Sequence, residues 1–77
     1  MDSLIAIFAE TLSVDAASLD DDSSPDNISQ WDSVNAMHLV DAIEQAFSIK
    51  LSTAEIMSMS TIGLARSVLR KKGLAGV

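Results

Sequence analysis

Apolar residues recur every three or four positions in three stretches of the chain, a spacing typical of amphipathic helices. The first stretch runs from Leu4 to Leu12, the second from about Asp32 to Phe47, and the third from Ile62 to Leu69. In the second stretch, the side chains expected to face the core are those of Ala36, Leu39, Val40, Ile43, Ala46 and Phe47. Because no alternating strand pattern competes with these stretches, the sequence predicts an all-α fold.

Polar residues mark where these helices should begin and end. The candidate N-caps are Asp2 or Ser3 for the first helix, Ser52 or Thr53 for a short turn through Met57, and Ser60 or Thr61 for the last helix. Cations at residues 70–72 and the following Gly73 suit the end of the last helix. Residues 15–31 form a long polar connection that we expect to wrap around the fold. The prediction is three longer helices and one short helix.

Composition limits the chemistry that this chain can perform. The 77 residues suit one domain, 1–77, and 48% of them are hydrophobic. The absence of cysteine excludes disulfides, thiolate metal sites and a cysteine nucleophile. The single histidine, His38, is expected on a solvated helix surface. The run Asp20-Asp21-Asp22 does not fit the spacing of a calcium loop. We therefore expect no catalytic residue and no metal site.

Charge is distributed unevenly along the chain. The net charge is −6, yet residues 1–49 contain ten acidic side chains and no basic one, whereas residues 50–77 contain all five basic groups and only one acid, Glu55. This balance argues against nucleic acid and anionic membrane partners, and it favours proteins with basic patches. It is also compatible with acidity that serves only solubility. With no long apolar run and no basic leader at the N-terminus, we expect a cytoplasmic monomer without membrane insertion.

The start of the second helix has an unusual outward face. At about 100° per residue in an ideal helix, Val34 and Met37 fall outside the core-facing arc, beside Asp41 and Glu44 and next to Ser33. This pattern suits an interaction surface. On spacing alone, the pattern is more typical of ordinary helix-start residues at 32 and 33 and of isolated exposed apolar side chains that need no function. Three other large apolar residues are expected in the core: Trp31, Met57 and Met59.

The segment from Asp32 to Phe47 resembles the Asp-Ser-Leu helix of acyl carrier proteins. Three flanking segments resemble the corresponding parts of that family: Val14–Leu19, Ile49–Ser52 and Met59–Ile62. The resemblance covers nearly the whole chain, and it implies an acyl-carrier-like four-helix bundle. In that family the serine carries a 4′-phosphopantetheine arm that comes from coenzyme A. The resemblance therefore implies that Ser33 is the attachment site and that the protein is a carrier, not an enzyme.

The same resemblance implies a set of partners and a surface that binds them. Asp32 would help to position metal-bound coenzyme A during modification by a phosphopantetheinyl transferase. Later partners would be an acyl- or aminoacyl-activating ligase and acyltransferases or synthases. The implied partner-binding residues are Asp32, Val34, Met37, Asp41 and Glu44. The cargo would be an acyl intermediate, held as a thioester, of a fatty-acid, polyketide or other specialised biosynthetic pathway.

Some residues depart from the pattern of fatty-acid carriers. Trp31 replaces a small residue, Val34 replaces the usual leucine, and His38 and Asp41 stand where an acid and a hydrophobe are common. These departures make the chain look more like the stand-alone carriers of specialised pathways. Two alternatives remain: an aminoacyl carrier of the D-alanyl or peptidyl type, and a small helical interaction domain that is never modified.

Overall fold

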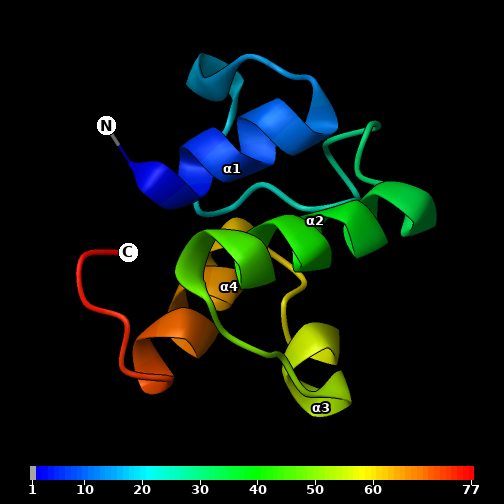
Figure 1. Cartoon of the computed structure of the whole chain (residues 1–77). Coiled ribbons are helices and arrows are strands. Elements are labelled where there is room, and N and C mark those ends of the chain that lie inside the picture. Colours follow the sequence, from blue (N-terminus) through cyan, green and yellow to red (C-terminus); the bar gives the residue numbers. More distant parts are fainter. Residues whose placement is uncertain (1) are drawn as a thin grey trace.

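The computed structural model describes residues 2–77, and the regular elements of this range are all helical. The elements in chain order are α1 (Ser3–Leu12), the 3₁₀ turn η1 (Ala16–Ser18), α2 (Ser33–Phe47), α3 (Thr53–Met57) and α4 (Ile62–Lys71) (Figure 1). The predicted all-α fold with three longer helices and one short helix is thus confirmed. The 3₁₀ turn was not predicted, because three residues are too few to show an apolar period.

Each α-helix begins at a side chain that accepts a hydrogen bond from the first turn. The N-caps are Asp2, Asp32, Ser52 and Thr61, in agreement with the candidate caps for the first, third and fourth helices. Ser52 and Glu55 form a reciprocal capping box, which stabilises the very short α3. Helices α1 and α2 end at Ser13 and Ser48 in the left-handed conformation, with φ of 57° and 54°. These caps fix the helix boundaries locally.

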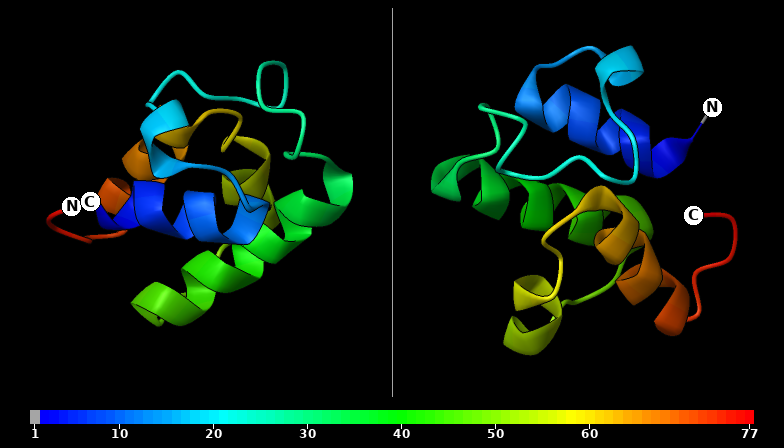
Figure 2. Two further views of the ribbon diagram at one scale, coloured as in Figure 1. Left: turned by 90° about the horizontal axis from the view of Figure 1, so that it is seen from above. Right: turned by 180° about the vertical axis from the view of Figure 1, so that it is seen from behind.

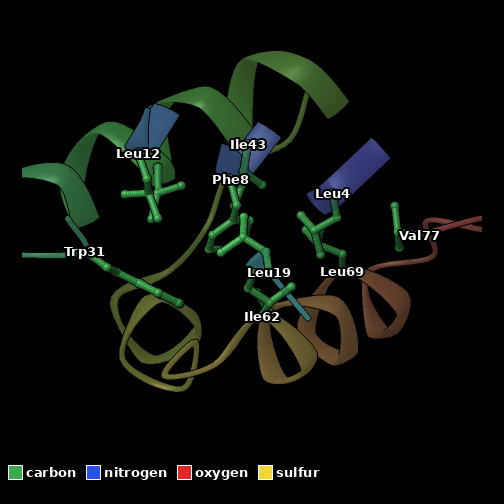
Figure 3. Close-up of a cluster of buried hydrophobic side chains, with 11 residues drawn as sticks. Leu4, Phe8, Leu12, Leu19, Trp31, Ile43, Ile62, Leu69 and Val77 are labelled. Atoms are coloured by element: carbon green, nitrogen blue, oxygen red, sulfur yellow. The ribbon is translucent and has the colours of Figure 1, made fainter. Parts of the chain in front are cut away.

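The core is formed where α1, α2 and α4 meet (Figure 3). The largest fully buried side chains are Phe8, Leu4, Leu12, Ile43, Ile62 and Leu69. At one end of this cluster Trp31 packs edge-on against Phe8, with ring centroids 5.1 Å apart, and Val77 lies at the other end. Burial in the core confirms the expectation for Trp31. Since Trp31 comes two residues before Ser33, the core anchors the chain directly before α2.

Two predicted core positions are wrong. Ala46 is exposed and lines a surface hollow together with Ile7 and Thr11 of α1, so α1 does not cover it. Met57 is 78% exposed, whereas the preceding Ile56 is partly buried and lines an apolar cavity with α1 and α2. The five residues of α3 form little more than one turn, in which Ile56 faces the cavity and Met57 faces solvent. Phe47 was expected on the core-facing arc and is only partly buried.

The connection between η1 and α2 is held against the start of α4. The backbone N–H of Gly63 donates to the carbonyl of Asp21 at 2.9 Å, and that of Ile62 donates to the carbonyl of Ser23 at 3.1 Å. A Cβ atom at Gly63 would lie only 3.0 Å from the Asp21 carbonyl oxygen, so this close approach suits glycine. The views in Figure 2 show this connection passing the start of α1 and then crossing the molecule before α2 begins. The predicted wrapping of residues 15–31 is thereby confirmed.

Candidate functional site

Ser33 is the first residue of α2, and its side chain is exposed. The carboxylate of the N-cap Asp32 accepts from the backbone N–H of Asn35 at 2.8 Å, and the Asp32 carbonyl accepts from the N–H of Ala36, also at 2.8 Å. The N–H groups of the first helical residues have no intrahelical partner, so this end of α2 carries partial positive charge. The Ser33 hydroxyl therefore lies where an attached anion would be stabilised.

The side chains that follow Ser33 on the outer side of α2 are exposed as predicted. Val34 is 64% exposed and Met37 is 58% exposed, and Asp41 is exposed one turn further along. His38, which was expected to be solvated, is exposed as well. We call Val34, Met37 and Asp41 the outer face of α2. This face combines apolar area with negative charge beside the serine.

Glu44 differs from the prediction that placed it on this exposed side. Its side chain is partly buried, and its Oε2 accepts a hydrogen bond from the backbone N–H of Leu51 at 2.8 Å. The carboxylate therefore ties the end of α2 to the connection that leads into α3. Helical periodicity places Glu44 near Met37, but it does not reveal that a later backbone N–H approaches the carboxylate.

Arg66 of α4 binds two acidic groups from distant parts of the sequence. Its Nη2 lies 2.7 Å from Asp2 Oδ2 and 2.9 Å from Asp21 Oδ1. Hydrogen bonding from this guanidinium holds the pKa of Asp2 below its usual range, and the two carboxylates raise the pKa of Arg66. The other ion pair in residues 2–77 joins Lys72 to Glu55 at 3.1 Å. Across this range Asp32 and Asp41 have no basic partner, so negative charge remains around Ser33.

The start of α1 repeats the local pattern found at the start of α2. Asp2 caps α1, Ser3 is its first residue, and the apolar Leu4 follows, in parallel with Asp32, Ser33 and Val34. The surroundings of the two serines differ. Leu4 is 0% exposed, and Asp2 is bound to Arg66, so of these two helix starts only that of α2 combines an exposed apolar side chain with a cap carboxylate that has no basic partner. Tertiary packing thus distinguishes two helix starts that look alike in sequence.

Comparison with known families identifies the class to which this arrangement belongs. A family model described as a phosphopantetheine attachment site matches residues 2–64. The chain belongs to the acyl carrier protein-type family. Members of this family attach a 4′-phosphopantetheine group and are not catalytic themselves, so this protein is a phosphopantetheine-carrying carrier protein. The matched range contains both Ser3 and Ser33, so the match by itself does not choose between them.

A small apolar cavity lies beside α2 of the carrier protein. Its volume is about 50 Å³, and it is lined by Phe8, Trp31, Ala36, Leu39, Val40, Ile56 and Met59. Met59 is partly buried against the core, as expected from its sequence context. All of these lining side chains are hydrophobic and none is charged, so the cavity offers no ionic partner to a charged ligand.

In residues 2–77 no three His, Asp or Glu side chains come together in a group that could hold a metal ion. Among the helices of this range, none has the length and hydropathy to cross a membrane.

Proposed function

We propose that residues 1–77 act as one carrier domain that bears acyl intermediates as thioesters on a 4′-phosphopantetheine arm attached to Ser33. The observation that carries this proposal is the exposed serine at the first position of α2, beside the exposed Val34. It supports Ser33 over Ser3, since the residue that follows Ser3 is fully buried.

The residues around Ser33 fit such a group. Attachment requires no buried side chain to move, because the hydroxyl is already exposed. The N-terminal end of α2 stabilises the negative charge of a phosphodiester. A serine hydroxyl is a weak nucleophile unless a base activates it, which favours modification of Ser33 by a separate transferase. When bound, the arm supplies the thiol that forms the thioester, while the chain presents and orients the attachment point.

Partner enzymes would dock on the outer face of α2. Val34 and Met37 provide apolar contact area next to Ser33, and Asp32 and Asp41 provide negative charge that attracts basic surfaces. Glu44 contributes by holding the connection to α3 in place, because its carboxylate accepts from Leu51. The proposed partners are a phosphopantetheinyl transferase, an acyl- or aminoacyl-activating ligase, and acyltransferases or synthases.

The size of the apolar cavity favours a short acyl cargo. At about 50 Å³ it is far smaller than the roughly 150 Å³ apolar cavity that accommodates a benzene molecule in another protein. A long fatty-acyl chain would not fit there unless α3 moved away from α2. A cargo that enters this cavity would therefore be short, as the intermediates of a polyketide or other specialised pathway can be. An aminoacyl group is the second candidate cargo, because it is also short.

Intact-mass spectrometry tests the proposal. The purified protein would be incubated with coenzyme A, magnesium and a promiscuous phosphopantetheinyl transferase. We expect the protein to gain the mass of a single phosphopantetheine group. If several such transferases add nothing to folded protein, the chain is better explained as an unmodified helical interaction domain.

A further inference from the structure

The side chain of Asn35 joins the first turn of α2 to the connection before it. Its Nδ2 donates to the backbone carbonyl of Gln30 at 2.8 Å. Its backbone N–H donates to the carboxylate of Asp32, also at 2.8 Å. Asn35 therefore takes part in the N-cap of α2 through its backbone, and its side chain links residue 35 to residue 30.

Three side-chain contacts hold the backbone on both sides of Ser33. Trp31 is buried against Phe8, Asp32 caps α2, and Asn35 fixes Gln30. Only the first of these contacts belongs to the hydrophobic core. The Asn35 amide ties the exposed turn at residues 29–30 to the first turn of α2, and Ser33 is within this closed segment.

We propose that Asn35 is a positioning residue for the modification of Ser33, an inference that rests on the proposed function. In that reaction Ser33 Oγ forms a bond to the phosphorus that bears the pantetheine arm of coenzyme A. The bond from this phosphorus to the 3′,5′-bisphosphoadenosine leaving group breaks, and the Oγ proton passes to a base of the transferase. Small displacements of an attacking atom lower the rate strongly. Asn35 limits such displacement while the outer face of α2 is bound.

Substitutions at this position separate positioning from helix stability. Asn35→Asp removes the amide donor but places an acid in the first turn of α2, where the helix dipole favours it. Asn35→Ala removes the donor without adding charge. Asn27→Asp is the matched control, because the Asn27 Nδ2 donates to the carbonyl of Asp22 at 3.3 Å elsewhere in the same connection. It involves the same chemical change outside the closed segment of residues 30–35 that contains Ser33.

The experiment measures kcat and KM of a phosphopantetheinyl transferase for the wild-type protein and the three variants, together with their melting temperatures. We expect both Asn35 variants to lower kcat by about threefold to tenfold, the range of one net hydrogen bond, with KM unchanged. Asn35→Asp should melt no lower than wild type, and Asn27→Asp should match wild type in kcat.

Other outcomes overturn the inference in distinguishable ways. Unchanged kcat in both Asn35 variants means that the amide does not position Ser33. A higher KM at constant kcat means that Asn35 contacts the transferase directly. A loss seen only in Asn35→Asp assigns the effect to the added charge. If the wild-type protein itself is not modified, the proposed function fails, whereas modification of the wild type with unchanged Asn35 variants removes only the role of Asn35.

Discussion

Ser3 and Ser33 are each the first residue of a helix, and each directly follows an aspartate N-cap. What separates them is the side chain that follows each serine, since Leu4 is fully buried and Val34 is 64% exposed. Helical periodicity predicted that Val34 and Met37 face outward, because each lies outside the apolar arc of α2. It did not predict the hydrogen bond of Glu44 to Leu51, which depends on where the chain goes after α2 ends.

At the residue scale, substitutions of Glu44 separate its hydrogen bond from its charge. Glu44→Gln keeps an oxygen acceptor for the Leu51 N–H, whereas Glu44→Ala leaves that N–H without it. We expect Glu44→Ala to lower the free energy of unfolding by about 1 kcal/mol and Glu44→Gln by clearly less. The measurement is urea unfolding of both variants.

Asp41→Asn is the control for charge in this comparison, since Asp41 is exposed on the outer face of α2. It should leave the free energy of unfolding nearly unchanged while reducing the rate at which a basic partner associates. Equal destabilisation by Glu44→Gln and Glu44→Ala would show that the acceptor oxygen contributes nothing and that charge alone accounts for the effect.

At the scale of elements, the apolar pattern predicted the helices well because each long helix buries one face. The caps followed from residue type, and Asp2, Ser52 and Thr61 were all among the candidates. The pattern was less informative at the edges of the buried faces. Whether Ala46 is covered depends on how α1 packs beside it, and whether Met57 is covered depends on the length of α3. Local periodicity reveals neither.

Two alanine substitutions within α2 test the orientation of this helix. Ile43 is fully buried, so Ile43→Ala should lower the free energy of unfolding by about 2–5 kcal/mol. Met37 is 58% exposed, so Met37→Ala should change it by at most about 0.5 kcal/mol, while it lowers kcat/KM with a partner enzyme. Thermal melts and transferase kinetics of both variants provide the comparison. Similar loss of stability in the two variants would mean that α2 is rotated from the orientation described above.

For α3, local polar contacts replace the large buried face of the longer helices. No residue of this helix is fully buried, and its N-terminus depends on the capping box. The pKa of Glu55 lies below its usual range, mainly because its carboxylate accepts a hydrogen bond from the backbone N–H of Ser52. A hydrogen bond from the Lys72 ammonium group lowers this pKa further. The Lys72 contact connects α3 to the end of α4. The sequence indicated the cap, but the ion pair joins residues 17 positions apart, beyond the reach of helical spacing.

At the scale of the whole molecule, Arg66 connects the acidic N-terminal part of the chain to the more basic C-terminal part. The pairs with Asp2 and Asp21 span 64 and 45 positions of sequence. Composition predicted the unequal charge of the two parts but not that one arginine would bind two of the acids. The practical consequence is that acidic charge is partly compensated around α1 and α4, whereas it is not compensated at Asp32 and Asp41.

The pair between Arg66 and Asp2 should make stability depend on pH. Since the folded-state pKa of Asp2 is lowered, its contribution is present above the unfolded value of about 4 and is lost as pH falls through the folded value. Asp2→Asn keeps a good N-cap but loses the charge. We expect it to destabilise the fold at pH 7 by only about 0.5–1 kcal/mol, because the pair is screened by solvent. Urea unfolding at a series of pH values should show the difference from wild type shrinking in acid.

Asp15→Asn is the matched control for this titration, because Asp15 caps η1 with its carboxylate instead of binding Arg66. Its difference from wild type at pH 7 should be smaller than that of Asp2→Asn. A destabilisation by Asp2→Asn that stays constant from neutral to strongly acidic pH would contradict a charge pair and would assign the effect to the cap alone.

The most direct test of the central claim is site-resolved mass spectrometry of the modified protein. Wild type, Ser33→Ala and Ser3→Ala would each be treated with coenzyme A and the same transferase, and the position of the added group would be mapped on peptides. Both serines begin helices behind an aspartate cap, so the two variants are closely matched. We predict that Ser3→Ala is modified like wild type, with the group on Ser33, and that Ser33→Ala gains no mass. Addition to folded Ser33→Ala, or a group mapped to Ser3, would contradict the assignment of Ser33.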